Sequence, residues 1–389
     1  MTIKHIIFHL DHVAITAIAC LITLILALLA FNVKVLDPVA KALSNISVTD
    51  WIFKAESRYA THVKDSNIVI VDMTDLSSRA DIGMLLGEVV ANRPKAIGVD
   101  IIFEGESDDT EDDSILEAAA RRAAPVTVFA NKLVAYDKAS GQFDGVVSSF
   151  FKWYVPVTEG YANVTDNMEH TTVRKLTISL PTRHGRATSL ATQLARKTGV
   201  QVKGDKEIVI NFKPTDIKVI PANKVKANPE LLRGKTVLIG AFTEESDMQL
   251  TPVGKMPGVE LQACSLLTLL DHDNIHYLSR PLSIAIGLVL CYIYSVLYAL
   301  VALFIRTRRP SLRIFLTESR LMLSLTALVY ISLLTLMAYA VFVTLNVYVD
   351  MVIVLAMVAF VPLSLRLYSG LVKVLRLHQL TPFTGHSLY

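Results

Sequence analysis

The sequence predicts an α/β domain built on a mostly parallel sheet flanked by helices, together with four transmembrane helices, one before the domain and three after it. Three observations lead to this fold class. Charged residues make up only 19% of the 389 residues, compared with about 25% in soluble domains. Long apolar runs lie near both ends of the chain. Between them, short apolar stretches alternate with helical patterns, which is typical of a parallel sheet covered by helices.

Apolar runs long enough to cross a bilayer indicate the spans. Residues 13–33 carry no charge and would form a helix of about 31 Å. This run is too long for the apolar part of a signal peptide and lacks a small-residue cleavage site, so we expect an uncleaved anchor. The apolar stretch near the C-terminus contains a single charge, Asp350, and suits two helices joined by a turn. We therefore expect transmembrane helices at residues 13–33, 282–305, 321–343 and 348–368.

Basic residues indicate how these spans are oriented. The segment between the second and third spans is rich in arginine and has one acid, Glu318. The segment after the last span is also basic, whereas the turn at 346–350 has no basic residue. By the positive-inside rule, we expect residues 1–12, 306–320 and 369–389 to be cytoplasmic and the block at 34–280 to be extracytoplasmic.

The sequence of the extracytoplasmic block predicts helices and strands along its whole length. A helical pattern covers 37–61, and residues 174–180 alternate as a half-buried strand. Buried strands are expected where apolar, often β-branched, residues run together, at 68–71, 96–103, 126–130, 207–212 and 235–241. Helices are expected where apolar residues recur every three or four positions, at 82–92, 111–123, 187–198 and 258–270. Residues 132–167 form the least regular insertion.

Acidic residues gather at the ends of predicted strands. Asp72 and Asp100 belong to two buried strands, and Asp247 follows the strand at 235–241. Ligands of parallel α/β sheets bind beyond the carboxyl ends of the strands. These three residues are therefore candidates for binding a ligand, either a divalent cation or polar groups. The alternative is that they cap helices and accept hydrogen bonds from loop amides.

Other conspicuous features favour structural interpretations. The acidic run at 104–113 lacks the glycine that a calcium loop needs at its turn, which favours a solvated helix entry. Trp51 and Trp153 are interpreted as core or membrane-interface aromatics rather than pocket residues. The triplet at 234–236 resembles the end of a phosphate loop but precedes a strand instead of following one. Because no catalytic motif is present, we expect neither enzymatic activity nor a cofactor.

Three segments of the block resemble a known family. Residues 68–78, 93–119 and 231–270 are similar to the type-two CHASE domain (CHASE2), a cyclase- and histidine-kinase-associated sensing extracellular domain. The family's middle pattern falls on Gly98, Asp100, Phe103 and Asp112–Asp113. Its closing pattern falls on Ile239, Gly240, Asp247, Thr251, Pro252, Pro257, Gly258, Val259 and Glu260. One span before the domain and three after it also match the family.

The resemblance implies a sensory domain on a multi-pass protein of the bacterial inner (cytoplasmic) membrane, with the domain in the periplasm or outside. This chain departs from the family in two places. The stretch at 76–83 is shorter than in relatives, and Arg79 alone corresponds to the arginine they carry there. Relatives usually continue into a cyclase, histidine kinase or protein kinase, so we expect a stand-alone member without an output domain.

Two functions remain open. The first is an envelope receptor that detects an extracytoplasmic signal and passes it through its helices to a separate cytoplasmic or membrane protein, as a homodimer or a hetero-complex. The second is a structural subunit that docks other envelope proteins. Small residues that suit close helix packing lie on the second span, at Ser283, Gly287, Ser295, Ala299 and Ala302. Candidates for docking an acidic partner are Arg306, Arg308, Arg309 and Arg313. These arginines lie between apolar runs, so we expect lipid around the spans and no nucleic-acid partner.

Overall fold

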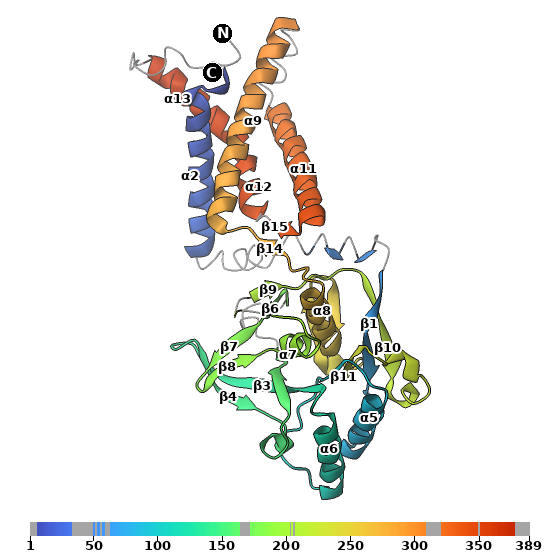
Figure 1. Ribbon diagram of the computed structural model, residues 1–389. Coiled ribbons are helices and arrows are strands. Elements are labelled where there is room, and N and C mark those ends of the chain that lie inside the picture. The colour runs from blue at the N-terminus through green and yellow to red at the C-terminus, as the bar shows by residue number, and fades with distance from the viewer. Residues whose placement is uncertain are drawn as a thin grey trace. The chain divides into compact units, whose positions relative to one another are not determined.

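The computed structural model divides the chain into two compact units (Figure 1). Residues 1–48 and 276–389 form one, called the membrane unit here, and residues 49–275 form the other, called the α/β unit. The structure describes residues 6–32, 50, 53–54, 57–58, 63–163, 172–202, 204, 207–308, 320–348 and 351–377. Most of the helix predicted at 37–61 lies outside these residues.

The α/β unit is built on a sheet whose central strands are parallel, as the sequence predicts. In order across the sheet, these strands are β10 (Thr215–Pro221), β1 (Val63–Asp72), β11 (Thr236–Gly240), β2 (Ala96–Val99), β3 (Thr127–Asp137) and β5 (Thr158–Tyr161). β11 comes late in the chain but lies between β1 and β2. It therefore brings its own C-terminal loop between the loops that follow the two earlier strands.

The remainder of the sheet mixes antiparallel and parallel pairing, and only its strand near residue 180 overlaps a predicted strand, the one at 174–180. The second half of β3 pairs with β4 (Gln142–Val147), and the sheet continues through β7 (Ser179–Thr182) and β8 (Gly185–Thr188). The supposed insertion at 132–167 thus contains β4 and β5. It appeared irregular in the sequence because β4 is exposed at alternate residues along one side, so it has no continuous apolar run.

The strand predictions at 96–103 and 207–212 differ from the structure in extent or pairing. β2 ends at Val99, and the apolar residues up to Phe103 belong to the following loop. The strand predicted at 207–212 is shortened to β9 (Glu207–Val209) and pairs with β6 (Lys175–Thr177) outside the main sheet. β10 takes the edge position instead, with the alternating burial of an edge strand. Apolar content alone could not identify which strand pairs with β1.

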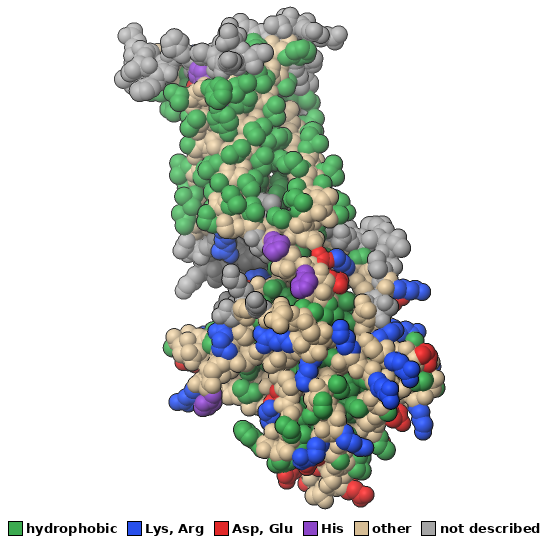
Figure 2. All heavy atoms as spheres, in the orientation of Figure 1, with side chains coloured by type: hydrophobic (Ala, Val, Ile, Leu, Met, Phe, Trp, Pro, Cys, Tyr) green, Lys and Arg blue, Asp and Glu red, His purple; other side chains and the backbone are tan. Residues whose placement is uncertain are grey.

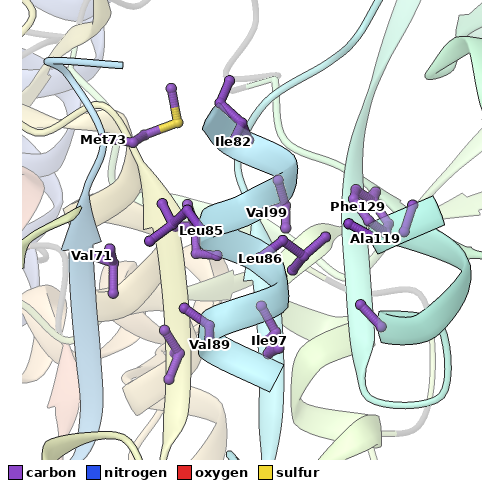
Figure 3. Close-up of a cluster of buried hydrophobic side chains, with 14 of the residues drawn as sticks. Val71, Met73, Ile82, Leu85, Leu86, Val89, Ile97, Val99, Ala119 and Phe129 are labelled. Atoms are coloured by element: carbon purple, nitrogen blue, oxygen red, sulfur yellow. The ribbon is translucent and has the colours of Figure 1, made fainter. Parts of the chain in front are cut away.

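Helices cover both faces of the parallel strands. α5 (Arg79–Ala91) and α6 (Thr110–Ala123) pack together on one face, and α7 (Leu190–Lys197) and α8 (Gly258–Leu270) pack together on the other. Successive side chains of a strand point to opposite faces. Accordingly, Ile97 and Val99 of β2 join the core under α5, where Leu86 and Val89 lie close to them (Figure 3).

Gly98, between those two residues, faces α7. A Cβ at this position would lie 2.6 Å from Leu194 Cδ1 and 2.7 Å from Leu238 Cδ2. Glycine is therefore required here for the close approach of α7 to the sheet.

The membrane unit contains four helical segments that are long and apolar enough to span a bilayer, as predicted. They are α2 (Leu10–Asn32), α9 (Arg280–Arg308), α11 (Arg320–Leu345), and the pair α12 (Met351–Ala359) and α13 (Val361–Leu377). Their visible surface is mainly hydrophobic, whereas charged side chains gather on the α/β unit (Figure 2). Helix α13 continues beyond residue 368, at which the sequence predicted the last span to end.

The helices of the membrane unit enclose a hydrophobic core, and small and polar side chains add contacts between them. Gly287 of α9 faces α12, since a Cβ there would lie 2.9 Å from Met357 Sδ. His12 of α2 is buried, with its Nδ1 hydrogen-bonded to Ser295 Oγ at 2.6 Å. The Tyr368 hydroxyl of α13 donates to Asp11 Oδ1 at 2.7 Å. Part of the small face predicted for the second span is thus used within the chain itself.

Candidate functional site at the carboxyl edge of the sheet

Asp72 is the last residue of β1 and holds the loops beyond it. Its Oδ1 accepts hydrogen bonds from the backbone N–H of Thr74 at 3.0 Å and of Phe242 at 3.1 Å. The Thr74 hydroxyl also donates to this oxygen, at 2.5 Å. Phe242 follows β11, so Asp72 joins the loops of two neighbouring strands. This arrangement corresponds to the loop-capping alternative.

Asp100 directly follows β2, on the other side of β11. Its backbone N–H donates to Ile239 O at 2.8 Å, which continues the pairing of the two strands. Burial, and to a smaller extent the nearby charge of Asp247, raises the pKa of Asp100 to about 7. Within the described residues, no hydrogen bond to this carboxyl group is present. Asp100 therefore takes up a proton near neutral pH, unlike an ordinary aspartate.

Asp247 lies at the N-terminus of α8. It ends a short 3-10 helix (Glu245–Asp247), and its carboxylate accepts the backbone N–H of Gly258, the first residue of α8. Burial raises the pKa of Asp247 and Glu244 adds to this effect, whereas the Gly258 hydrogen bond opposes it. A Cβ on Gly258 would lie 2.6 Å from Asp247 Oδ2. Glycine thus lets the carboxylate reach the positive end of the helix dipole.

A further acidic residue, the partly buried Glu260, lies at the same end of α8. Burial raises the pKa of Glu260, in the first turn. One turn later, burial and Glu260 together raise the pKa of the Cys264 thiol to about 12, so this cysteine is not a reactive thiolate. Among the described residues, no group of three or more histidine, cysteine or acidic side chains is arranged to hold a metal ion. The site can present carboxyl groups to a polar or cationic ligand, with Asp100 able to change its charge near neutral pH.

A second polar cluster lies beyond β2 and holds the acidic run at 104–113. Arg79 donates to Asp113 Oδ1 at 2.6 Å and to the backbone oxygens of Gly105 and Glu104 at 2.9 and 3.2 Å. Burial raises the pKa of Asp113, but hydrogen bonds from Arg79 and Ser107 outweigh it and bring the pKa below its usual value. Asp109 caps α6 through the N–H groups of the first turn. The run is therefore a structured helix entry.

The sequence indicated only part of these two clusters. The role of Asp113 was missed, because its partner Arg79 lies on another helix. The Asp247–Gly258 contact was missed as well, although a Pro-Gly pair opening an apolar helix shortly after an acidic residue was visible in the chain.

A model of the CHASE2 domain matches residues 17–302, more than half of the chain. The chain belongs to the CHASE2 family. This confirms the resemblance found in the sequence, and CHASE2 is a family of sensory domains. No curated protein and no solved structure matches the chain significantly.

In this CHASE2 protein, the structure separates the predicted acidic set. The charge of Asp247 raises the pKa of Asp100, whereas Asp72 accepts hydrogen bonds from loop amides. Their role in binding a ligand stays a prediction. Of the predicted docking arginines, Arg306 and Arg308 lie in the last turn of α9, and Arg309 and Arg313 lie outside the described residues.

The two tryptophans of this CHASE2 protein are Trp51 and Trp153. Trp153 is 86% exposed, so its interpretation as a core residue was wrong. It lies in a short 3-10 helix (Phe150–Trp153) in which Phe151 is the buried aromatic. Trp51 lies outside the described residues.

Proposed function

We propose that this protein is a bacterial envelope receptor rather than an enzyme. Its α/β unit lies outside the inner membrane and detects a signal there, and its helices pass that signal to a separate polypeptide. Membership of a sensory domain family supports the sensing role. Four apolar helices support attachment to a membrane.

The observation that carries this proposal is the acidic site at the start of α8. A ligand that brings a cation or a hydrogen-bond donor to Asp100 relieves its repulsion with Asp247 and changes the charge at the N-terminus of α8. Helix α8 ends at Leu270, and only residues 271–279 connect it to α9, which starts at Arg280. A change at the acidic site therefore acts on the helix that leads directly into a span.

Photo-crosslinking in cells tests this proposal. A photo-reactive residue at Val301, which is 54% exposed on α9, should join the full-length chain to another polypeptide. Asp247→Asn should change the crosslinking yield at least threefold. Asp144→Asn is the matched control, because Asp144 is an exposed acid on β4, and it should leave the yield unchanged. Equal crosslinking yields in the parent protein, Asp247→Asn and Asp144→Asn, or no crosslinked polypeptide at all, would refute the proposal.

A docking subunit is the second candidate, and one observation favours it. Trp153 is 86% exposed and its neighbour Tyr154 is 47% exposed, and such aromatic residues often dominate binding interfaces. In that case, Trp153→Ser should abolish a complex that Asp247→Asn leaves intact. Pull-down of tagged full-length protein from detergent-solubilised membranes measures both effects. A complex that Asp247→Asn abolishes and Trp153→Ser leaves intact would support the receptor.

A further inference from the structure

A groove opens in the membrane unit between the first turns of α11 and the junction of α12 with α13. Its volume is 450 Å³, and its lining is apolar except for Ser324 and Arg366. Leu328 of α11 is 59% exposed and Leu363 of α13 is 46% exposed. The described residues therefore leave an apolar surface uncovered between two candidate spans.

The groove results from a break in the last span. Helix α12 ends at Ala359 and α13 begins at Val361. Pro362 has no N–H and cannot continue the hydrogen bonding of α12, although it suits the first turn of a new helix. Helix α12 packs against α9 and α11, whereas α13 packs mainly against α2 (Figure 1). The chain thus moves away from α11 after the break and leaves a gap beside it.

Arg366 places a positive charge at this gap. The span starts at Met351, and Arg366 lies about 22 Å further along its helices. This length is less than the hydrocarbon core of a bilayer, which is about 30 Å thick. The side chain is exposed, and its guanidinium group has no hydrogen bond or ion pair within the described residues. A charge at such depth is costly unless it is paired, and no acid of the groove lining is available to pair with it.

We propose that the groove binds one anionic phospholipid, with the phosphate on Arg366 and an acyl chain along Leu328, Ile331 and Leu363. A guanidinium group matches the geometry of a phosphate and binds it through two parallel hydrogen bonds. Basic pockets between transmembrane helices bind anionic headgroups in this way. A helix of another protein would cover the apolar walls but would bring no phosphate to the arginine. This inference goes beyond the receptor proposal, because it does not depend on what the α/β unit detects.

Native mass spectrometry of the full-length chain tests this site. The protein is released from nanodiscs containing equal amounts of phosphatidylglycerol and phosphatidylcholine. We expect one retained phosphatidylglycerol, favoured at least fivefold over phosphatidylcholine, and at least a fivefold loss of that retention in Arg366→Gln. Lys373→Gln is the matched control, since it removes an equal charge from an exposed position on α13 outside the groove, and it should change retention less than twofold.

A second variant tests the apolar part of the site while keeping the arginine. Leu363→Trp fills the groove and should lower retention of phosphatidylglycerol at least threefold, with wild-type helicity by circular dichroism. A phosphatidylglycerol with a photo-reactive acyl chain should label the peptide that contains Leu328. Equal losses in Arg366→Gln and Lys373→Gln would overturn the proposal by indicating general attraction to anionic lipid. Failure of the photo-reactive lipid to label that peptide, or displacement of the lipid by soluble glycerol phosphate, would also overturn it.

Discussion

At the scale of single residues, neighbouring aspartates differ because their surroundings differ. Asp72 accepts two backbone N–H groups, Asp247 accepts one at a helix N-terminus, and the carboxyl of Asp100 accepts none from the described residues. Hydrogen bonds from amides favour the charged form of a carboxyl, and burial disfavours it. Asp100 is consequently the acid whose pKa rises to about 7.

Asp100→Asn should make the stability of the protein less dependent on pH. The pKa of Asp100 is about 7 in the folded state, above the value of about 3.9 in an unfolded chain. The folded state therefore binds this proton more tightly, and the stability it contributes is lost as pH rises through 7. Between pH 5 and pH 8, the wild type should lose on the order of 2–3 kcal/mol that the variant does not lose.

Thermal unfolding of the full-length chain in nanodiscs, followed by tryptophan fluorescence at a series of pH values, measures this difference. Asp144→Asn serves as the control, because Asp144 is exposed. Parallel pH profiles for the wild type and Asp100→Asn would contradict the prediction.

Asp113 should show the opposite pH dependence. Although burial raises its pKa, hydrogen bonds from Arg79 and Ser107 bring the folded-state pKa below the usual value. Its contribution to stability is therefore present at neutral pH and lost as pH falls through the folded-state pKa. Asp113→Asn should lower the free energy of unfolding by about 1–2 kcal/mol at pH 7. At acidic pH the same substitution should lower it by less. A double-mutant cycle with Arg79→Ala should give a coupling energy above about 0.5 kcal/mol, and additive effects would argue against the pair.

At the scale of elements, the start of α8 depends on a glycine. Gly258→Ala would place a Cβ 2.6 Å from Asp247 Oδ2, so the carboxylate must turn away and lose its hydrogen bond to the helix N-terminus. We expect a loss of about 1 kcal/mol of stability. Hydrogen exchange of the peptides covering 258–270, in the full-length chain, should become faster. In the background of Asp247→Ala the same glycine substitution should be nearly neutral, and an undiminished effect there would refute the role of this contact.

The elements also differ in how well local pattern predicts them. α6 and α8 were predicted within one residue of their observed bounds, because acidic and glycine residues mark their starts and apolar residues repeat with helical spacing. β4 and β10 were not predicted, because each is partly exposed and lacks a continuous apolar run. Their assignment depends on the strands beside them.

At the scale of the whole molecule, the arginine asymmetry predicts the topology. Ser140 lies in the exposed turn between β3 and β4, within the part expected to be extracytoplasmic, and Ser387 lies in the expected cytoplasmic tail. In a background whose native cysteines are replaced, Ser140→Cys should react with a membrane-impermeant maleimide in intact cells. Ser387→Cys should react only after permeabilisation. Equal labelling of both positions in intact cells would contradict the topology.

The candidate site was partly visible in the sequence. The ends of parallel strands meet at one edge of a sheet, so Asp72 and Asp100 could be placed there from strand prediction alone. Sequence could not determine that Asp72 is bound by loop amides while Asp100 lies near Asp247. That distinction depends on β11, which lies between β1 and β2 and brings its loop and α8 onto the site.

The sequence by itself determined the four apolar spans, the parallel sheet and the family, because hydropathy, strand-forming runs and local motifs are properties of short segments. Only the tertiary structure decided the order of the strands, the different surroundings of the aspartates and the groove beside Arg366. Each of these features joins segments that are distant in the chain. Such contacts depend on which surfaces pack together, and a local pattern of residues does not specify its partner.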